Sequence, residues 1–492
     1  MDPGELLRRT AELAEAFLAG LDERPVGRPV DLAALRTAMG GPLPADGEDP
    51  LAVVEGLARA ADPGIVATAG PRYFGFVIGG SQPAALAADW LTSAWDQNAG
   101  LYAISPAAAV AEEVAGDWLV ELFGLPPGTS YGFTTGATMA NFTALGAARQ
   151  AVLRDLGWDV EERGLFDAPA INVVVGDEAH VTVFVSLQML GLGRGRVLRV
   201  AADGQGRMRP DALRATLAGL EGPTIVAAQA GNVNTGAFDP LPEIAAAVRE
   251  HGGWLHVDGA FGLWAAVSPA LRERVAGLDL ADSWTTDAHK WLNVPYDSGL
   301  VFVRDAAAHR TSMTLGAAYY IETEGAERDP YNWVAESSRR ARGFPIYAAL
   351  RSLGRNGLAA LIDRCCAHAR HFAELLGGRP GITILNDVVL NQVLVRFSPP
   401  GESAASSEAD AQTRDAGDAP SATADALTRD VITRVQADGT CWLGGTTWHG
   451  IAAMRISVSS WATTEADVES SAAAILRCAR EAAEAHLRAT PV

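Results

Sequence analysis

The sequence predicts an α/β fold with a mostly parallel central sheet, helices on both faces of that sheet, and a smaller α+β domain at its C-terminal end. Between residues 105 and 305, short β-branched runs such as INVVVGD, TIVAAQA and WLHVDGA alternate with helical segments and short loops. This alternation is typical of a parallel sheet. After about residue 345, a long helical pattern precedes the strand patterns ITILND, NQVLVRFS and AMRISVSS.

These patterns divide the chain into three expected parts. Residues 1–95 form a helical segment, because LLRRTAELAEAFLAGL and DPLAVVEGLARAA are amphipathic at the helical period and flank a linker rich in Pro and Gly. Residues 96–345 form the large α/β domain, and residues 346–492 form the small domain. Within the small domain, residues at about 399–426 are too poor in apolar side chains to pack, which predicts a mobile surface insertion.

The composition excludes several classes of protein. A net charge of −20 argues against nucleic-acid binding, which requires a basic surface. No apolar run approaches the ~18–20 residues of a membrane span, and the first residues lack the apolar stretch of a signal peptide. We therefore expect a cytoplasmic enzyme that does not bind membranes. The four cysteines form no CxxC pair, which predicts reduced, buried thiols, and we expect no metal site.

Lysine usage is the most unusual feature of the composition. Of the 39 basic residues, 38 are Arg and one is Lys. Arg can replace Lys at a solvated surface, but it cannot replace Lys as a nucleophilic amine, because its guanidinium stays protonated. The single lysine, Lys290, is therefore a candidate for chemistry. A chance surface lysine is the alternative, and the neighbouring residues decide between the two.

Other candidate residues stand at the ends of predicted strands. Lys290 lies in DAHKW just after a strand, and active sites of parallel sheets form at the carboxyl ends of strands. Asp258 closes the apolar strand WLHVDGA, where a carboxylate needs a partner such as a protonated ring nitrogen. His180 follows the strand INVVVGD, and the turn TTGAT around Gly136 precedes a helix whose free N–H groups suit a phosphate. Taken singly, each has a structural explanation, such as a helix cap for the Asp.

Together and in this order, these residues resemble the group II decarboxylases that depend on pyridoxal 5′-phosphate (PLP), a family with aromatic amino acid, histidine and glutamate decarboxylases. The resemblance covers nearly the whole chain and is carried by TTGATMANFTAL, DEAH, GNVNTGAFDP, HVDGAFG, DAHKWLNVPYDSG, RDPYNW and MRISVSSWATTEADV. It implies the fold of fold-type I PLP enzymes, PLP bound to Lys290 as a Schiff base, and decarboxylation of an L-amino acid to its amine and CO₂. It also implies a homodimer with shared active sites, in which the N-terminal helices contact the partner subunit.

The resemblance assigns cofactor contacts to a set of positions around the lysine. It implies Asp258 at the pyridinium nitrogen, His180 stacked on the ring and Ala260 beneath it. The remaining contacts that it implies come from Gly136, Ala137 and Thr138 at the phosphate, from His289 beside the lysine, and from Asn234 near the hydroxyl side of the ring. Asp287 stands where eukaryotic relatives often have Asn, and its role is left open.

Substrate-binding residues are expected from the two ends of the chain. Arg455, in AMRISV, is a candidate for binding the substrate carboxylate, with a structural Arg on a strand edge as the alternative. Phe74 and Trp95 are candidates for the substrate pocket, although core packing explains such aromatic residues as well. The identity of the amino-acid substrate stays open.

Several reactions are compatible with the same cofactor site. They include aminotransfer, aldolase or lyase chemistry, and oxidative deamination coupled to decarboxylation, because the reaction depends on which bond the site holds perpendicular to the ring. Tyr331, in RDPYNW, corresponds to the tyrosine that protonates the product carbanion in this family, with Tyr319 and Tyr320 as reserves. This tyrosine favours simple decarboxylation. A non-catalytic homologue is the remaining alternative, and the intact set around Lys290 argues against it.

Overall fold

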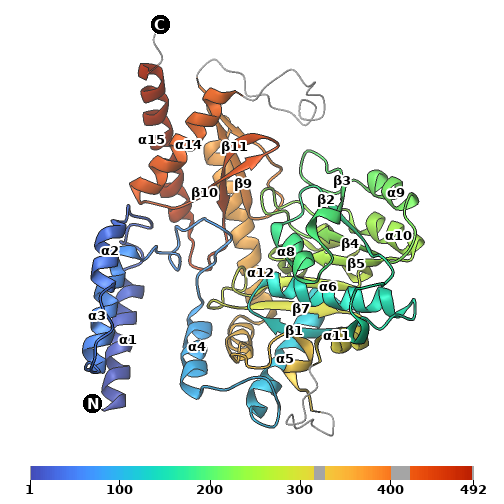
Figure 1. Ribbon diagram of the computed structural model, residues 1–492. Helices are drawn as coiled ribbons and strands as arrows, with labels where there is room; N and C mark the ends of the chain where they lie inside the picture. Colours follow the sequence, from blue (N-terminus) through green and yellow to red (C-terminus); the bar gives the residue numbers. More distant parts are fainter. Residues whose placement is uncertain (1, 315–326, 400–420, 490–492) are drawn as a thin grey trace.

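A computed structural model describes residues 2–314, 327–399 and 421–489 of the chain. Figure 1 shows helices α1 to α3 at one side, a large domain built around the main sheet, and a small domain that contains α14 and α15. The long helix α12 (Gly343–Leu376) runs from the large domain into the small one. Tyr319 and Tyr320 lie outside the described residues.

The central sheet has seven strands in the order β1-β7-β6-β5-β4-β2-β3. Strands β6, β5, β4, β2 and β3 are parallel, and β7 is antiparallel to both β6 and β1. The predicted mostly parallel sheet is thus confirmed. The strand bounds are β1 Ser130–Thr134, β2 Asn172–Gly176, β3 Leu198–Val200, β4 Thr224–Gln229, β5 Trp254–Asp258, β6 Ser283–Asp287 and β7 Gly299–Val303.

Helices cover both faces of this sheet because successive side chains of a strand point to opposite sides. In β2, Val173 and Val175 pack with α6, α8 and α11, whereas Val174 belongs to the main core together with residues of α5, α9, α10 and α12. The helix bounds are α4 Pro83–Trp95, α5 Pro106–Phe123, α6 Ala137–Arg154, α7 Val160–Arg163, α8 Val181–Met189, α9 Pro210–Ala218, α10 Leu241–His251 and α11 Ala306–Met313.

The small domain contains an antiparallel sheet in the order β10-β11-β9-β8. Most of the expected insertion at 399–426 lies outside the described residues. From Ala422 onward the chain forms α14, which Ser421 caps by accepting the Ala424 N–H at 3.2 Å. The element bounds are β8 Ile382–Ile384, β9 Gln392–Phe397, α14 Ala422–Asp438, β10 Gly444–Trp448, β11 Ile451–Ser457 and α15 Glu465–Ala489.

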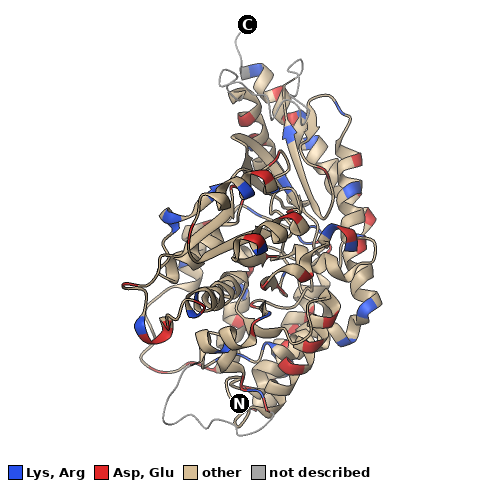
Figure 2. Ribbon diagram, turned by 90° about the vertical axis from the view of Figure 1, so that its right-hand side faces the viewer, with Lys and Arg blue, Asp and Glu red and all other residues tan. Residues whose placement is uncertain are grey.

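The N-terminal helices α1 (Pro3–Ala19), α2 (Leu32–Met39) and α3 (Pro50–Ala61) contain no buried residue. Helix α2 lies in the segment that the sequence predicted as a linker, and Asp31 caps it by accepting two backbone N–H groups. Figure 2 shows acidic and basic residues interspersed along the outer helices of the face that it presents. Among the described residues, no helix combines the length and apolarity needed to cross a bilayer.

Candidate active site

Strands β5 and β6 are parallel neighbours, and each ends in a buried carboxylate. Asp258 ends β5 and is 3% exposed, and Asp287 ends β6 and is 2% exposed. Because the two strands are paired in parallel, with Asp258 opposite Thr285, both carboxylates reach the same edge of the sheet. Lys290 comes shortly after the end of β6, at Asp287, so it lies near the carboxyl end of a strand, where the sequence predicted it.

Asp258 is held by a network of polar side chains inside the large domain. One oxygen accepts the Ala260 N–H at 3.1 Å, and the other accepts the Asn141 side-chain amide at 3.2 Å. The Asn141 oxygen in turn lies 2.9 Å from His256 Nε2 and accepts the Thr285 hydroxyl at 2.9 Å. Burial lowers the pKa of His256 to about 4, so this ring is neutral at pH 7. The network fixes the carboxylate without placing a cation beside it.

The same amide group connects Asp258 to His180. Asn141 Nδ2 also donates to Thr182 Oγ1 at 3.2 Å, and this hydroxyl lies 2.9 Å from His180 Nδ1. His180 lies between β2 and α8, and it is the N-cap residue of α8, where its side chain accepts the Thr182 N–H. Burial lowers its pKa, against the opposing effect of Asp258. Neither Asn141 nor Thr182 was singled out from the sequence. The only sequence signal for either residue is that Asn141 lies inside the motif TTGATMANFTAL.

Lys290 is held beside the N-terminus of α6. Its Nζ lies 3.1 Å from Asp287 Oδ2, and Asp287 Oδ1 accepts the N–H of Ala137, the first residue of α6, at 2.6 Å. Gly136 precedes that helix and contributes no capping side chain. A Cβ at position 299 would lie 2.4 Å from the Gly136 Cα, so only glycine at 299 lets β7 approach the turn this closely. The lysine and the predicted phosphate turn therefore lie together.

These residues fit PLP in two respects. Asp258 is a buried carboxylate, and in the described part of the chain no basic side chain forms an ion pair with it, so a pyridinium nitrogen would compensate its charge. The N–H groups of Thr138 and Met139, at the start of α6, have no protein acceptor among the described residues. Free N–H groups at a helix N-terminus suit a phosphate.

The small domain brings Arg455 towards this group. Arg455 lies on β11 opposite Leu394 and Gly444, burial lowers its pKa, and its charge acts on His180. Among the described residues its guanidinium forms no ion pair, which is unusual for a largely buried Arg. Asn234 lies at the domain junction, where its Oδ1 accepts the Thr446 hydroxyl at 3.0 Å.

Three candidate residues lie apart from this cluster. Phe74 is fully buried and packs edge-on against Phe372 at 5.0 Å, so its ring serves the core and presents no surface to a substrate. Trp95, at the end of α4, is half exposed and packs edge-on against Phe344 at 5.0 Å. Tyr331 is 1% exposed on the short helix η6 (Pro330–Trp333), and its backbone N–H donates to the Gly100 carbonyl.

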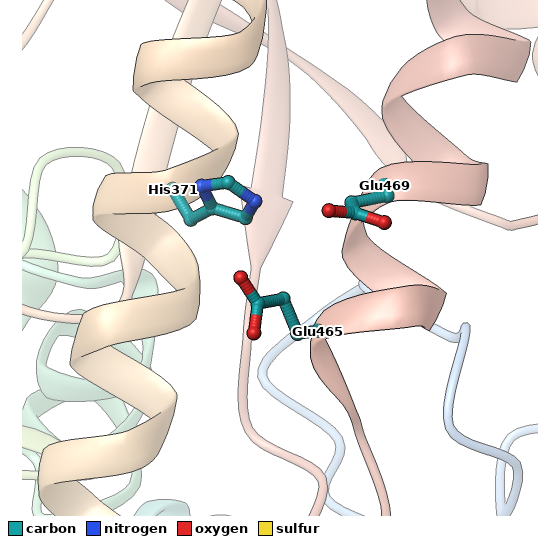
Figure 3. A group of neighbouring side chains, drawn as sticks. All are labelled: His371, Glu465 and Glu469. Carbon is teal, nitrogen blue, oxygen red and sulfur yellow. The ribbon is translucent and has the colours of Figure 1, made fainter.

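One group of side chains in the described residues has the spacing of metal ligands, and it lies in the small domain. His371 of α12 faces Glu465 and Glu469 of α15, with the possible ligand atoms within 4.8 Å of one another (Figure 3). Both carboxylates are exposed, and Glu465 belongs to the first turn of α15, where acidic side chains favour the helix dipole. His371 Nδ1 forms its ion pair with Glu374 of its own helix, at 3.6 Å, and the expectation of no metal stays a prediction.

The family follows from a comparison with known proteins. A family model described as the pyridoxal-dependent decarboxylase conserved domain matches residues 34–398. The chain belongs to this family. Membership confirms the predicted family, the PLP cofactor, and an enzyme that decarboxylates an amino acid.

Individual relatives act on different amino acids. The aromatic-L-amino-acid decarboxylase of Bacillus atrophaeus is 28% identical over 388 residues, 77% of this chain and 78% of that protein. The L-2,4-diaminobutyrate decarboxylase of Rhizobium meliloti is 34% identical over 320 residues, 64% of this chain and 62% of that protein. The structure of Oryza sativa TDC with PLP and tryptamine shares the fold with a TM-score of 0.87, 24% identity and 98% coverage of both chains.

Proposed function

We propose that Lys290 is the amine that binds PLP covalently, that Asp258 faces the ring nitrogen, and that His180 stacks on the ring while an L-amino acid is decarboxylated. The observation that supports this best is the hydrogen-bonded connection from Asp258 to His180 beside the only lysine of the chain. When bound, PLP supplies an electron sink for the electrons of the broken bond between Cα and the carboxylate.

Each side chain has a separate task. The Asp258 carboxylate is buried and has no ion-pair partner in the described chain, so it would favour a protonated ring nitrogen on the bound cofactor. His180 is kept neutral by burial, so it can lie against a cationic ring without charge repulsion. Arg455 has a guanidinium that no carboxylate of the described chain neutralises, so it suits the carboxylate of an amino acid. Lys290 supplies the amine that would hold the cofactor covalently.

Tyr331 is retained as the donor of the proton that Cα receives. Its ring is buried on η6, so this role requires η6 to open and expose the phenol. The segment before η6, residues 315–326, lies outside the described residues.

Stacked rings near the lysine favour an amino acid with an aromatic side chain. Tyr296 stacks on His289 with ring centroids 4.1 Å apart, and Tyr73 stacks on Trp442 at 5.0 Å with an angle of 7° between the planes. The two phenols are near enough for Tyr73 to contribute to the raised pKa of Tyr296, which burial dominates. Flat rings of this kind bind aromatic side chains by stacking.

The uncovered N-terminal helices support a homodimer. An apolar groove of about 830 Å³ lies between α1 and α4, lined by residues that include Phe17, Leu86, Trp90 and Trp461. Trp90 and Trp95 of α4 remain 44% and 49% exposed. A second copy that laid its own N-terminal helices here would bury these faces, which a single chain leaves in water.

Borohydride reduction of the protein with PLP tests the site directly. We expect the cofactor to be fixed at one peptide, the one containing Lys290, because no other lysine exists. The same protein should release CO₂ and an amine from an aromatic L-amino acid. A keto acid formed in stoichiometric amounts with an amino acceptor would refute the decarboxylase, and unmodified Lys290 would refute the site.

A further inference from the structure

The carboxylate of Asp287 contacts donors from three parts of the site. Oδ1 accepts the Ala137 N–H at 2.6 Å, and Oδ2 lies 3.1 Å from Lys290 Nζ. Oδ1 also lies 3.5 Å from His289 Nε2. The other ring nitrogen of His289 accepts the Ser298 N–H at 3.0 Å, so in the neutral ring the proton sits on Nε2 and faces Asp287. One carboxylate thus links the lysine, its neighbouring histidine and a helix.

The helix end that Asp287 occupies is also the place that suits a phosphate. The N-cap residue of α6 is Gly136, which has no side chain to accept a hydrogen bond from the helix. Asp287, at the end of β6, accepts the Ala137 N–H instead. It takes the first N–H of the helix, while the next two, of Thr138 and Met139, have no acceptor among the described residues. A phosphate on those two groups would lie beside a buried carboxylate. Like charges so close repel each other strongly away from water.

We propose that Asp287 is a positioning residue that holds Lys290 at the N-terminus of α6 and, as a resident anion there, competes with the cofactor's phosphate. This inference rests on the proposed function of Lys290. Its consequence is that the chain binds phosphate groups less tightly than its helix end alone would allow. The ion pair explains why the charge is kept, because the same carboxylate orients the amine that must meet the cofactor.

The substitution Asp287→Asn separates these effects. The amide oxygen of Asn can still accept the Ala137 N–H, so the cap remains while the negative charge is lost. In the full-length protein freed of cofactor, we expect inorganic phosphate to bind about tenfold more tightly, or more, to the variant than to the wild type, and the ratio of PLP to pyridoxal affinity to rise with it. Pyridoxal, which has no phosphate, should gain no such affinity. Binding is measured by isothermal calorimetry and by cofactor absorbance, without reference to activity.

Two further variants keep the test decisive. Asp305→Asn removes the charge of another helix-capping aspartate, the N-cap of α11 that accepts the Ala308 N–H, and it should leave phosphate affinity unchanged. Asp287→Ser also removes the charge and serves if the Asn variant does not fold. Equal or weaker binding of inorganic phosphate by the folded Asp287 variants overturns the proposal, as does an unchanged ratio of PLP to pyridoxal affinity. If the wild type itself does not bind PLP, the proposed function fails instead.

Discussion

Arg339 offers the sharpest test of how the large domain supports its site. Its side chain is completely buried, and Nη1 lies 2.7 Å from Glu112, which is also buried. Nη1 donates to the Ala99 carbonyl at 2.7 Å, and Nη2 donates to the Phe133 carbonyl at 2.6 Å. Phe133 immediately precedes Thr134, the last residue of β1 and the start of the phosphate turn. One guanidinium therefore joins α5, the segment before it and β1.

The substitution Arg339→Met should lower the free energy of unfolding by about 3–5 kcal/mol, the usual cost of leaving one partner of a buried pair uncompensated. Arg328 and Arg342 still act on Glu112, so we expect a value near the lower end of this range. Burial raises the pKa of Glu112, and removal of Arg339, which opposes this, raises it further. Because the folded chain then binds the proton more tightly than the unfolded chain, protonation stabilises it as the pH falls. The loss should be larger at pH 8 than at pH 5.

Urea denaturation at the two pH values measures both effects. Arg339→Met alone should unfold at a lower urea concentration than the double variant Glu112→Gln with Arg339→Met, because the double variant buries no unpaired charge. Equal midpoints for the single and double variants at pH 8 would show that the uncompensated carboxylate is not the cause. A loss independent of pH would refute the raised pKa of Glu112 as its source.

Three other changes test the site and the assembly. Asp258→Asn should keep PLP bound but lower kcat for CO₂ release by about 10²-fold or more, and unchanged turnover would contradict a carboxylate at the ring nitrogen. Arg455→Met should raise KM about tenfold or more with unaltered cofactor absorbance, whereas an unchanged KM would favour a structural role. Trp90→Glu should shift the protein from dimer to monomer in light scattering, while Leu156→Glu, at a still more exposed apolar position on the large domain, should not.

The fold was predictable because its signals are local. Strand runs alternating with helices specify a parallel sheet, and a parallel sheet gathers the residues that end its strands at one edge. Sequence position alone therefore predicts that Asp258 and His180 lie at this edge, and in the structure Asp258 ends β5 and His180 lies between β2 and α8. Helix α2 was missed because Pro and Gly flank it on both sides, although Asp31 offered a capping signal.

Partners distant in sequence could not be predicted in this way. In the sequence, Asn141 is one polar residue of a predicted helix, and only the packing of α6 on the sheet shows that its amide joins Asp258 to Thr182. For Phe74, the sequence leaves two roles open. An aromatic residue next to a glycine suits a pocket as well as a core, and only the structure shows that Phe74 packs edge-on against Phe372 of α12.

The single lysine shows how composition and structure constrain each other. Arg at 38 positions indicates that charge alone does not require Lys in this chain, so the requirement at 290 is for an amine. An amine next to a buried carboxylate at a helix N-terminus is held in one place, and Asp287 supplies that carboxylate. An Arg in the same position could form the ion pair equally well but could not form a covalent bond to a carbonyl carbon. The ion pair therefore explains where Lys290 lies, and the proposed covalent bond to the cofactor would explain why it is a lysine.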